Sequence, residues 1–420
     1  MTENPQEPSG SGTEAEGTAQ NAPAPEADTA PAPIPSPARV DAAATSPAET
    51  APVAVTEAGP APVVAVEPAA EPFPVPVPES APELAPAVVA ESVPEPAQEP
   101  APAPQSPSRE ALGALRTELG KAVVGQDQAV TGLVIALLCK GHVLMEGVPG
   151  VAKTLLVRTL AHALDVDFTR LQFTPDLMPG DVTGSMIYDA RTAAFSFREG
   201  PVFTNLLLAD EINRTPPKTQ AALLEAMEDR TVSVDGETRP LPDPFLVIAT
   251  QNPVEYEGTY PLPEAQLDRF LLKVTVPLPQ RDAETQVVRR HAQGFNPRDL
   301  AAAGIAPVAG IADIEAGRAE VAQVEISDDV VGYIVDICRA TREAPSVALG
   351  ASPRAAAALM TTSRAWAWMR GRTFVSPDDV KALATWTLAH RISVRAEAEL
   401  EGVTATAVIA NVLASVPVPR

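Results

Sequence analysis

The sequence has few cysteines, histidines and aromatic residues, and it lacks long apolar runs. Two cysteines among 420 residues cannot build a disulfide framework, and the four histidines do not have the spacing of metal ligands. The first residues have neither a basic start nor an apolar stretch, which argues against a secretory signal. The longest apolar helix candidate, residues 129–139, is too short to cross a bilayer. These absences predict a cytoplasmic protein without a membrane span.

Basic residues are nearly absent from the first quarter of the chain. Residues 1–108 contain 25 of the 46 prolines, sixteen acidic residues, one basic residue (Arg39) and one aromatic residue (Phe73). This composition cannot bury enough apolar surface to offset the conformational entropy that folding removes. We therefore predict a disordered tail over 1–108 with local polyproline II character. The remaining part is long enough for a large domain and a smaller one.

The folded part changes character along its length. Short apolar runs that do not alternate with polar residues are typical of strands covered by helices on both faces, and such runs lie at 142–146, 168–173, 206–209, 245–250 and 271–276. Helices are predicted between them at 153–164 and 217–229, which favours a parallel α/β sheet. Two hairpins are predicted near 185–198 and 231–240, the second around the turn dipeptide Asp235-Gly236. From 279 onward the pattern is helical, most clearly at 327–343, 353–369 and 377–389. Ser352 and Ser376, each followed by proline, are the predicted N-caps of the last two helices.

A phosphate-binding loop follows the first predicted strand and opens a helix. It consists of Gly147, Val148, Pro149, Gly150, Val151, Ala152, Lys153 and Thr154. Backbone N–H groups in such a loop can surround phosphate oxygens, while the lysine pairs with the β- and γ-phosphates and the threonine hydroxyl binds Mg²⁺. Ala152 stands where a second glycine is usual. Alanine keeps the N–H donor, so nucleotide binding is expected to survive provided that the backbone at this residue has a negative φ.

Two carboxylates end a buried strand about sixty residues further on. Asp210 and Glu211 follow the apolar run 206–209, so they should lie beside the phosphate loop, at the carboxyl edge of the sheet. Asp210 is suited to the coordination shell of Mg²⁺, and Glu211 to orienting and deprotonating a water. Such a pair alone is often only a solvated strand end. Together with the phosphate loop it predicts ATP hydrolysis with Mg²⁺.

These residues resemble the AAA+ superfamily, and residues 109–420 resemble its MoxR family, in the helix-2-insert branch. The matching stretches include Val123-Val124-Gly125-Gln126, Asp176-Leu177-Met178-Pro179-Gly180-Asp181, Gly200-Pro201-Val202-Phe203 and the run from Leu262 to Phe270. The resemblance implies an αβα core with a five-stranded parallel sheet and two hairpin insertions over 109–278. It also implies an all-α lid domain over 279–420.

The resemblance also implies roles for single residues. Val124, Gly125 and Gln126 fall where the family packs against adenine, and Asn252 resembles the sensor that contacts the attacking water or the γ-phosphate. Arg269 resembles the finger that reaches the nucleotide of a neighbouring subunit, with Arg214 as a second candidate. Arg354 resembles the lid sensor, which contacts the subunit's own nucleotide. Taken alone, Arg269 could equally be a surface arginine and Arg354 an ordinary first-turn residue.

The function implied is that of a ring ATPase, hexameric by resemblance, that remodels protein partners or assembles complexes. Family resemblance suggests clients that carry a von Willebrand factor A domain. A magnesium-chelatase-like ATPase subunit, a nucleotide-gated scaffold and a nucleic-acid motor are the alternatives. The net charge of −23 leaves −8 on residues 109–420, which disfavours a nucleic-acid partner.

Overall fold

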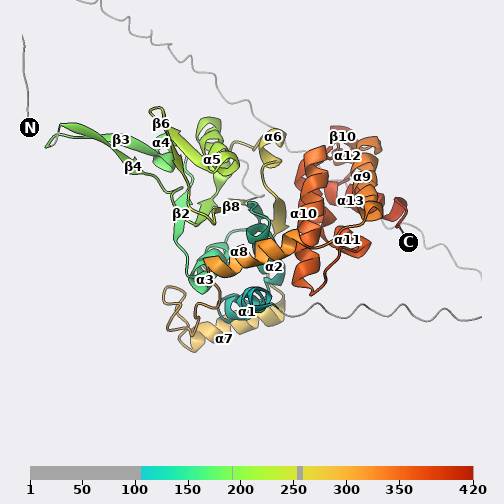
Figure 1. Cartoon of the computed structure of the whole chain (residues 1–420), viewed down its shortest axis with the longest axis horizontal. Coiled ribbons are helices and arrows are strands. Elements are labelled where there is room, and N and C mark those ends of the chain that lie inside the picture. The colour runs from blue at the N-terminus through green and yellow to red at the C-terminus, as the bar shows by residue number, and fades with distance from the viewer. Residues whose placement is uncertain (1–105, 192, 253–258, 420) are drawn as a thin grey trace, which may run out of the picture. The chain divides into compact units, whose positions relative to one another are not determined.

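The computed structural model describes residues 106–191, 193–252 and 259–419 (Figure 1). Most of the predicted tail 1–108 therefore lies outside the described residues. Its last two residues begin helix α1 (Pro107–Ala122), which Ser106 caps by accepting a hydrogen bond from the Arg109 N–H. Pro107 occupies the first turn of the helix, where its missing N–H costs nothing.

A five-stranded parallel sheet forms the centre of the described region, as predicted. Its strand order is β2-β5-β8-β1-β9, and every neighbouring pair is parallel. The strands are β1 (Val143–Glu146), β2 (Phe168–Gln172), β5 (Leu206–Asp210), β8 (Leu246–Gln251) and β9 (Leu272–Thr275). Because all five run the same way, their carboxyl ends meet at one edge of the sheet.

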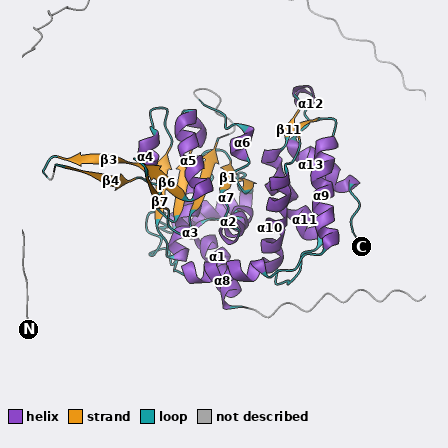
Figure 2. Ribbon diagram, turned by 45° about the horizontal axis from the view of Figure 1, so that its top comes forward, coloured by secondary structure: helices purple, strands orange, loops and turns teal. Residues whose placement is uncertain are grey.

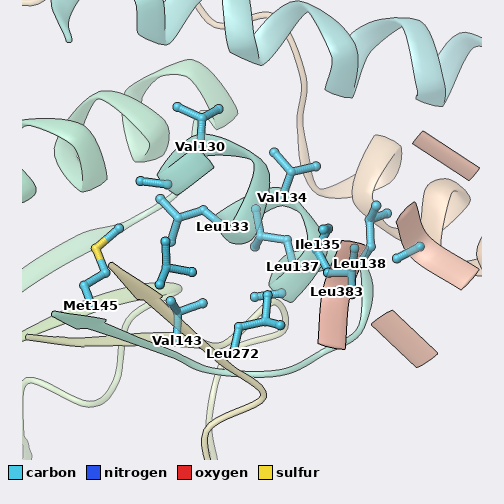
Figure 3. Packing of buried hydrophobic residues seen from close by; sticks show 14 of the residues in the cluster. Val130, Leu133, Val134, Ile135, Leu137, Leu138, Val143, Met145, Leu272 and Leu383 are labelled. Atoms are coloured by element: carbon cyan, nitrogen blue, oxygen red, sulfur yellow. The ribbon is translucent and has the colours of Figure 1, made fainter. Parts of the chain in front are cut away.

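Each face of the sheet has its own apolar core, which explains the runs without alternation. In β5, Leu206 and Leu208 join one core, while Leu207 and Ala209 join the other. The first face is covered by α1, α2 (Asp127–Leu138) and α3 (Lys153–Leu164), and the second by α5 (Pro217–Asp229). Side chains of α2 contact Val143 and Leu272 of the sheet and extend toward Leu383 of the C-terminal part (Figure 3).

Two antiparallel hairpins interrupt the α/β order at the predicted places. The first pairs β3 (Gly184–Asp189) with β4 (Ala194–Glu199) after the short helix α4 (Pro179–Thr183), and it projects away from the sheet (Figure 2). The second pairs β6 (Thr231–Val234) with β7 (Glu237–Pro240). Asp235 and Gly236 both have positive φ, as a two-residue turn of this kind requires.

The C-terminal part is helical apart from one small pair of strands. β10 (Val347–Leu349) pairs with β11 (Ser393–Val394), an addition that the sequence pattern did not indicate. Ser352 and Ser376 cap α10 and α11 as predicted. The remaining elements are η1 (Ile212–Arg214), α6 (Glu264–Leu267), α7 (Arg281–Ala292), α8 (Ile311–Ala322), α9 (Asp328–Glu343), α10 (Pro353–Met369), α11 (Pro377–Leu388), η2 (Ala389–Arg391), α12 (Ala396–Leu400) and α13 (Ala405–Ser415).

Helices α7 and α8 follow the predicted boundary at 279 yet pack on helices that precede it. Arg290 of α7 donates to the Gly120 and Lys121 carbonyls, and α8 lies against α1 and α2. A Cβ at Gly317 of α8 would stand 2.9 Å from Cδ2 of Leu138, so glycine lets α8 approach α2 without displacing that side chain. The boundaries 109–278 and 279–420 remain predictions. Among the described residues, no helix combines the length and apolar character needed to cross a bilayer.

Glu320 of α8 joins the start of α1 to α10. Its carboxylate accepts hydrogen bonds from the Ser106 and Ser108 hydroxyls at 2.6 and 2.7 Å and from Trp368 Nε1 at 2.8 Å. Burial alone would raise the pKa of Glu320, but these three hydrogen bonds and the charge of Arg109 outweigh it and lower the pKa. The ionised carboxylate is therefore the form that holds these helices together.

We predict that Glu320→Ala lowers the free energy of unfolding by about 2–3 kcal/mol, because a charged acceptor of three hydrogen bonds is lost. The folded pKa is depressed, so this contribution is fully present above the ordinary value of 4.5 and is lost as the pH falls through the folded pKa. Urea unfolding of both proteins at pH 7 and at about pH 3 measures it. Glu315→Ala, at an exposed position of the same helix, is the control. Equal losses for the two variants would contradict the assignment.

Candidate nucleotide site

The phosphate loop, residues 147–154, connects the carboxyl end of β1 to the first turn of α3. A Cβ at Gly147 would lie 2.5 Å from the carbonyl oxygen of Val276, so only glycine fits against the end of β9. Gly150 has φ +88° and Ala152 has φ +61°. Left-handed residues alternating with ordinary ones turn successive N–H groups toward one side, which makes a concavity for an anion. The loop therefore has a backbone suited to phosphate.

Ala152 adopts a conformation other than the one expected. A negative φ was the condition for nucleotide binding with alanine here, and it is not met: the residue is left-handed and directly precedes α3. For an L-amino acid this conformation costs about 1–2 kcal/mol, because Cβ crowds the following carbonyl oxygen. Such strain persists where the surrounding structure imposes it. Alanine's own preference is overridden by the loop, and the N–H donor is kept.

Lys153 is tied to its own loop and lies near both carboxylates. Its Nζ donates to the Gly147 carbonyl at 2.7 Å. Burial lowers the pKa of Lys153, while the negative charges of Asp210 and Glu211 act in the opposite direction. The lysine is thus within electrostatic range of the acids that were predicted to face it. Thr154 follows it in the first turn of α3 and is half-buried.

Asp210 is almost fully buried at the end of β5. One carboxylate oxygen, Oδ2, accepts from Arg170 Nε at 3.1 Å and from Arg170 Nη2 at 2.6 Å. The other, Oδ1, accepts from the Thr250 hydroxyl at 2.6 Å. The carboxylate is therefore held in one orientation by the neighbouring strands β2 and β8.

Glu211 is oriented by the same two strands and by the turn that follows it. Its backbone is left-handed at φ +58°, and its N–H donates to the Thr250 hydroxyl at 2.9 Å. Its side-chain Oε2 accepts from Gln172 Nε2 at 2.7 Å and forms an ion pair with Arg214 Nε at 3.0 Å. Arg214, the second candidate for a finger, thus contacts the carboxylate of its own chain.

Asn252 lies at the same edge of the sheet. It is buried and follows β8, the strand between β5 and β1, so it stands between Asp210 and the phosphate loop. The N–H of Gly147 donates to the Gln251 carbonyl, which joins the loop to the end of β8. The parallel sheet thus brings Lys153, Asp210, Glu211 and Asn252 to one edge.

An apolar pocket of about 460 Å³ opens beside the loop. Val124 and Gln126 line it, as the predicted adenine contacts should, and Gly125 lies between them with φ +76°. Gln126 is fixed by a hydrogen bond from Nε2 to the Pro277 carbonyl at 3.1 Å. Gly150, Val151 and Ala152 form the side of the pocket toward the phosphate loop. The pocket has the size and apolar lining of a site for a planar ring such as a base.

The opposite wall of this pocket is a part of the site that sequence reasoning missed. It consists of Leu278, Pro279, Glu284, Val287, Val288, Arg290, His291 and Phe295, mostly on or next to α7. No residue of α7 is buried, and Val288 is 68% exposed. The pair Val287-Val288, within a largely charged stretch directly after β9, was a usable signal in the sequence.

Arg269 and Arg354, called here the arginine pair, lie together at the other edge of the sheet. Both contact Glu228 of α5, Arg269 Nε at 2.8 Å and Arg354 Nη1 at 3.2 Å. They line a cavity of about 310 Å³ together with Gly141 and His142. Gly141 and His142 precede β1, whereas the phosphate loop follows β1, so the cavity and the loop lie at opposite ends of this strand. Arg269 precedes β9, whose first residue is aligned with the first residue of β1. The structure therefore does not place Arg354 at the chain's own phosphate loop, where it was expected.

The site's donor set fits Mg-ATP. Loop N–H groups and Lys153 match phosphate oxygens, the apolar pocket matches the base, and the oxygens of Thr154 and Asp210 are of the kind that Mg²⁺ prefers. A parallel sheet with this loop and these acids at its carboxyl edge is the arrangement of a P-loop ATPase. The ATPase family associated with various cellular activities (AAA) matches residues 142–272, and the AAA lid domain matches residues 339–412.

Similarity to whole proteins shows to which family of these ATPases the chain belongs. The chain is 48% identical over 308 residues to the uncharacterized protein YeaC of Bacillus subtilis, covering 73% of this chain and 95% of that protein. It is 43% identical over 312 residues to the chaperone MoxR1 of Mycobacterium tuberculosis, covering 72% of this chain and 81% of the other. A crystal structure of a Cytophaga hutchinsonii protein assigned as an ATPase superposes with a TM-score of 0.69 at 42% identity, covering 74% and 96% of the two chains. The chain belongs to the MoxR family of AAA+ ATPases.

We predict that Ala152→Gly raises the free energy of unfolding by about 1 kcal/mol, because glycine adopts φ +61° without the Cβ penalty. Since the N–H donor is unchanged, affinity for ADP should stay within about twofold of the wild type. Urea unfolding and isothermal titration calorimetry measure the two quantities. Ala161→Gly, within α3 where glycine is unfavourable, should lower stability instead. A loss of stability in Ala152→Gly would show that the loop does not strain this residue.

Proposed function

We propose that the protein hydrolyses ATP with Mg²⁺ at the carboxyl edge of its sheet. The observation that carries this proposal is the convergence of Lys153, Asp210 and Glu211, whose charges act on one another across the end of β8. When bound, Mg²⁺ neutralises negative charge on the β- and γ-phosphate oxygens. Lys153 would leave the Gly147 carbonyl to pair with those oxygens, and Thr154 and Asp210 would hold the cation.

Glu211 is the group that we assign to the attacking water. Its carboxylate is bound by Gln172 and Arg214 in this structure, so water activation requires that these contacts loosen. Thr250 fixes the backbone of Glu211 and the carboxylate of Asp210 with one hydroxyl. Asn252, buried beside them, would orient the water or the γ-phosphate through its amide.

The arginine pair supports action between subunits. Because Arg269 and Arg354 lie at the edge away from the chain's own phosphate loop, we propose that both reach the nucleotide of an adjacent copy. An arginine suits this task since its fixed charge and planar donors stabilise the oxygens of the transferring phosphoryl group. Each subunit would offer a phosphate edge on one side and an arginine edge on the other. Such a head-to-tail contact closes into a ring, for which six subunits remain the expectation.

The proposed output is the remodelling of a protein partner. The first hairpin presents apolar side chains to solvent, with Tyr188 54% and Phe195 68% exposed and their rings 5.2 Å apart. An exposed aromatic pair on a projecting hairpin is suited to contact with a polypeptide. We propose a chaperone-like activity on this basis. Proteins with a von Willebrand factor A domain remain the client class to test.

Lys153→Ala should weaken ADP binding by about a hundredfold or more, because the variant loses the cation that faces the phosphates. Isothermal titration calorimetry with ADP and Mg²⁺ measures this loss. Lys121→Ala, an exposed lysine near the far wall of the base pocket, serves as a charge-matched control and should bind normally. Unchanged affinity in Lys153→Ala would contradict the assignment of the loop.

Glu211→Gln should lower ATP turnover by at least about a hundredfold while ATP binding stays within a few fold, since the amide keeps the size but cannot accept a proton. Phosphate release by the wild type, with and without added DNA or RNA, sets the reference. Turnover that is equal in the two proteins would refute the role of Glu211. Strong stimulation by nucleic acid would contradict a protein-directed function. The Glu211→Gln variant, which should bind ATP without hydrolysing it, is also the bait for capturing a client protein.

A further inference from the structure

Residues 268–270, called here the finger segment, carry Arg269 and join α6 to β9. The segment is a tight turn in which the Arg269 N–H donates to the Gln266 carbonyl and the Phe270 N–H to the Leu267 carbonyl. Phe270 is fully buried, which fixes one end of the segment in the core beneath α5. The direction of the Arg269 side chain therefore depends on what holds the backbone at Asp268 and Phe270.

The C-terminal part of the chain holds the backbone carbonyls of both Asp268 and Phe270. Arg391 of η2 donates from Nη2 to the Phe270 carbonyl at 2.8 Å and to the Asp268 carbonyl at 3.3 Å. Its Nε lies 3.1 Å from Oδ1 of the Asp268 carboxylate. One guanidinium thus contacts the residue on each side of Arg269.

His390 adds a second donor to the same carbonyl. Its Nε2 lies 2.8 Å from the Phe270 oxygen, and a carbonyl only accepts, so Nε2 carries the proton. Burial, assisted by the positive charge of Arg391, lowers the pKa of His390 to about 3, so the ring is neutral at neutral pH. Two consecutive residues of η2 therefore hold one carbonyl of the finger segment.

The side chain of Arg391 is only 4% exposed, and an ion pair at that depth is a weak source of stability. Burial lowers the pKa of Arg391 to about 10, so the guanidinium keeps its charge at neutral pH. What Arg391 provides is direction, because its Nη2 donates to the carbonyls on both sides of Arg269 and so fixes the segment in one geometry. Arg391 and Arg354 also line the same cavity as Arg269. The C-terminal part thus carries one arginine of the pair and holds the other.

We propose that Arg391 is a positioning residue for Arg269, and that through η2 the C-terminal part sets where the finger points toward the adjacent subunit. This inference rests on the proposed ATPase function and extends it to the coupling between subunits. A displacement of η2 would move the finger segment with it, because the contacts of Arg391 and His390 are to backbone atoms. A subunit's own phosphate site lies at the other edge of the sheet and would be left unchanged.

Arg391→Lys tests the proposal in the full-length protein, since lysine keeps the charge but replaces the rigid planar guanidinium by a single ammonium on a flexible stem. We expect turnover to fall about tenfold or more while ADP affinity, measured by calorimetry, stays within about twofold. The matched control is Arg395→Lys. That arginine lies on the same stretch and donates to the Val347 carbonyl, away from the finger segment. Asp268→Asn, which weakens the ion pair alone, should show a smaller loss in the same direction.

Mixing subunits separates a positioning role from a general loss of structure. Glu211→Gln subunits lack the catalytic acid but keep Arg269 held by Arg391. Such a copy can therefore supply a correctly placed finger to the phosphate site of an adjacent Arg391→Lys subunit, which still has Glu211. Random mixing at equal amounts should restore about a quarter of wild-type turnover, because one interface in four joins two intact halves. Arg269→Ala mixed in the same way should recover equally. No recovery would overturn the proposal.

Amide hydrogen exchange gives a readout that does not depend on turnover. In Arg391→Lys, amides of residues 264–271 should exchange at least about tenfold faster than in Arg395→Lys, because the segment loses its anchors. The phosphate loop should exchange at the same rate in both variants. Unchanged exchange over 264–271 would overturn the inference about Arg391 even if the wild type is an active ATPase. An inactive wild type with faster exchange would instead reject the proposed function alone.

Discussion

The five central strands run parallel, and their common direction decides where every polar group of the site lies. Backbone hydrogen bonds fix the register of β2 on β5, of β5 on β8 and of β8 on β1, so the residues that end these strands stand side by side. Asp210 is the last residue of β5, Asn252 follows β8, and the phosphate loop follows β1. Their charges and donors meet only because two apolar cores cover the sheet on both faces and keep it rigid.

The same direction gives the subunit two chemically different edges. The carboxyl edge combines backbone donors, Lys153 and two acids. The amino edge carries the arginine pair, held by Glu228 and, through residues 268–270, by Arg391. The groups that bind the nucleotide and the arginine pair are thus separated by the length of the strands. A single copy has the means to bind a nucleotide, and the arginine that would complete the site comes from elsewhere.

Local sequence patterns predicted much of the fold, because the features concerned depend on neighbours in the chain. The Asp235-Gly236 turn and the serine caps at 352 and 376 are of this kind, and so is each strand covered on both faces. The site was predictable as far as its residues follow strands directly. Arg170, Gln172 and Glu228 escaped prediction because they reach their partners across strands or helices far apart in the sequence. The positive φ of Ala152 could not be predicted because the loop overrides alanine's own preference. The contact of Arg354 with Glu228 could not be predicted either, because side-chain packing of the C-terminal helices, which no local pattern reports, decides its place.

The most direct test of this account is a crystal structure of the Glu211→Gln variant assembled with ATP and Mg²⁺. We expect the triphosphate to lie between Lys153 and Asp210, with the base in the pocket lined by Val124 and α7. Lys153 Nζ should have exchanged the Gly147 carbonyl for a phosphate oxygen, and the arginine pair of an adjacent copy should face the γ-phosphate. A nucleotide bound elsewhere, with Lys153 still hydrogen-bonded to Gly147, would contradict the account.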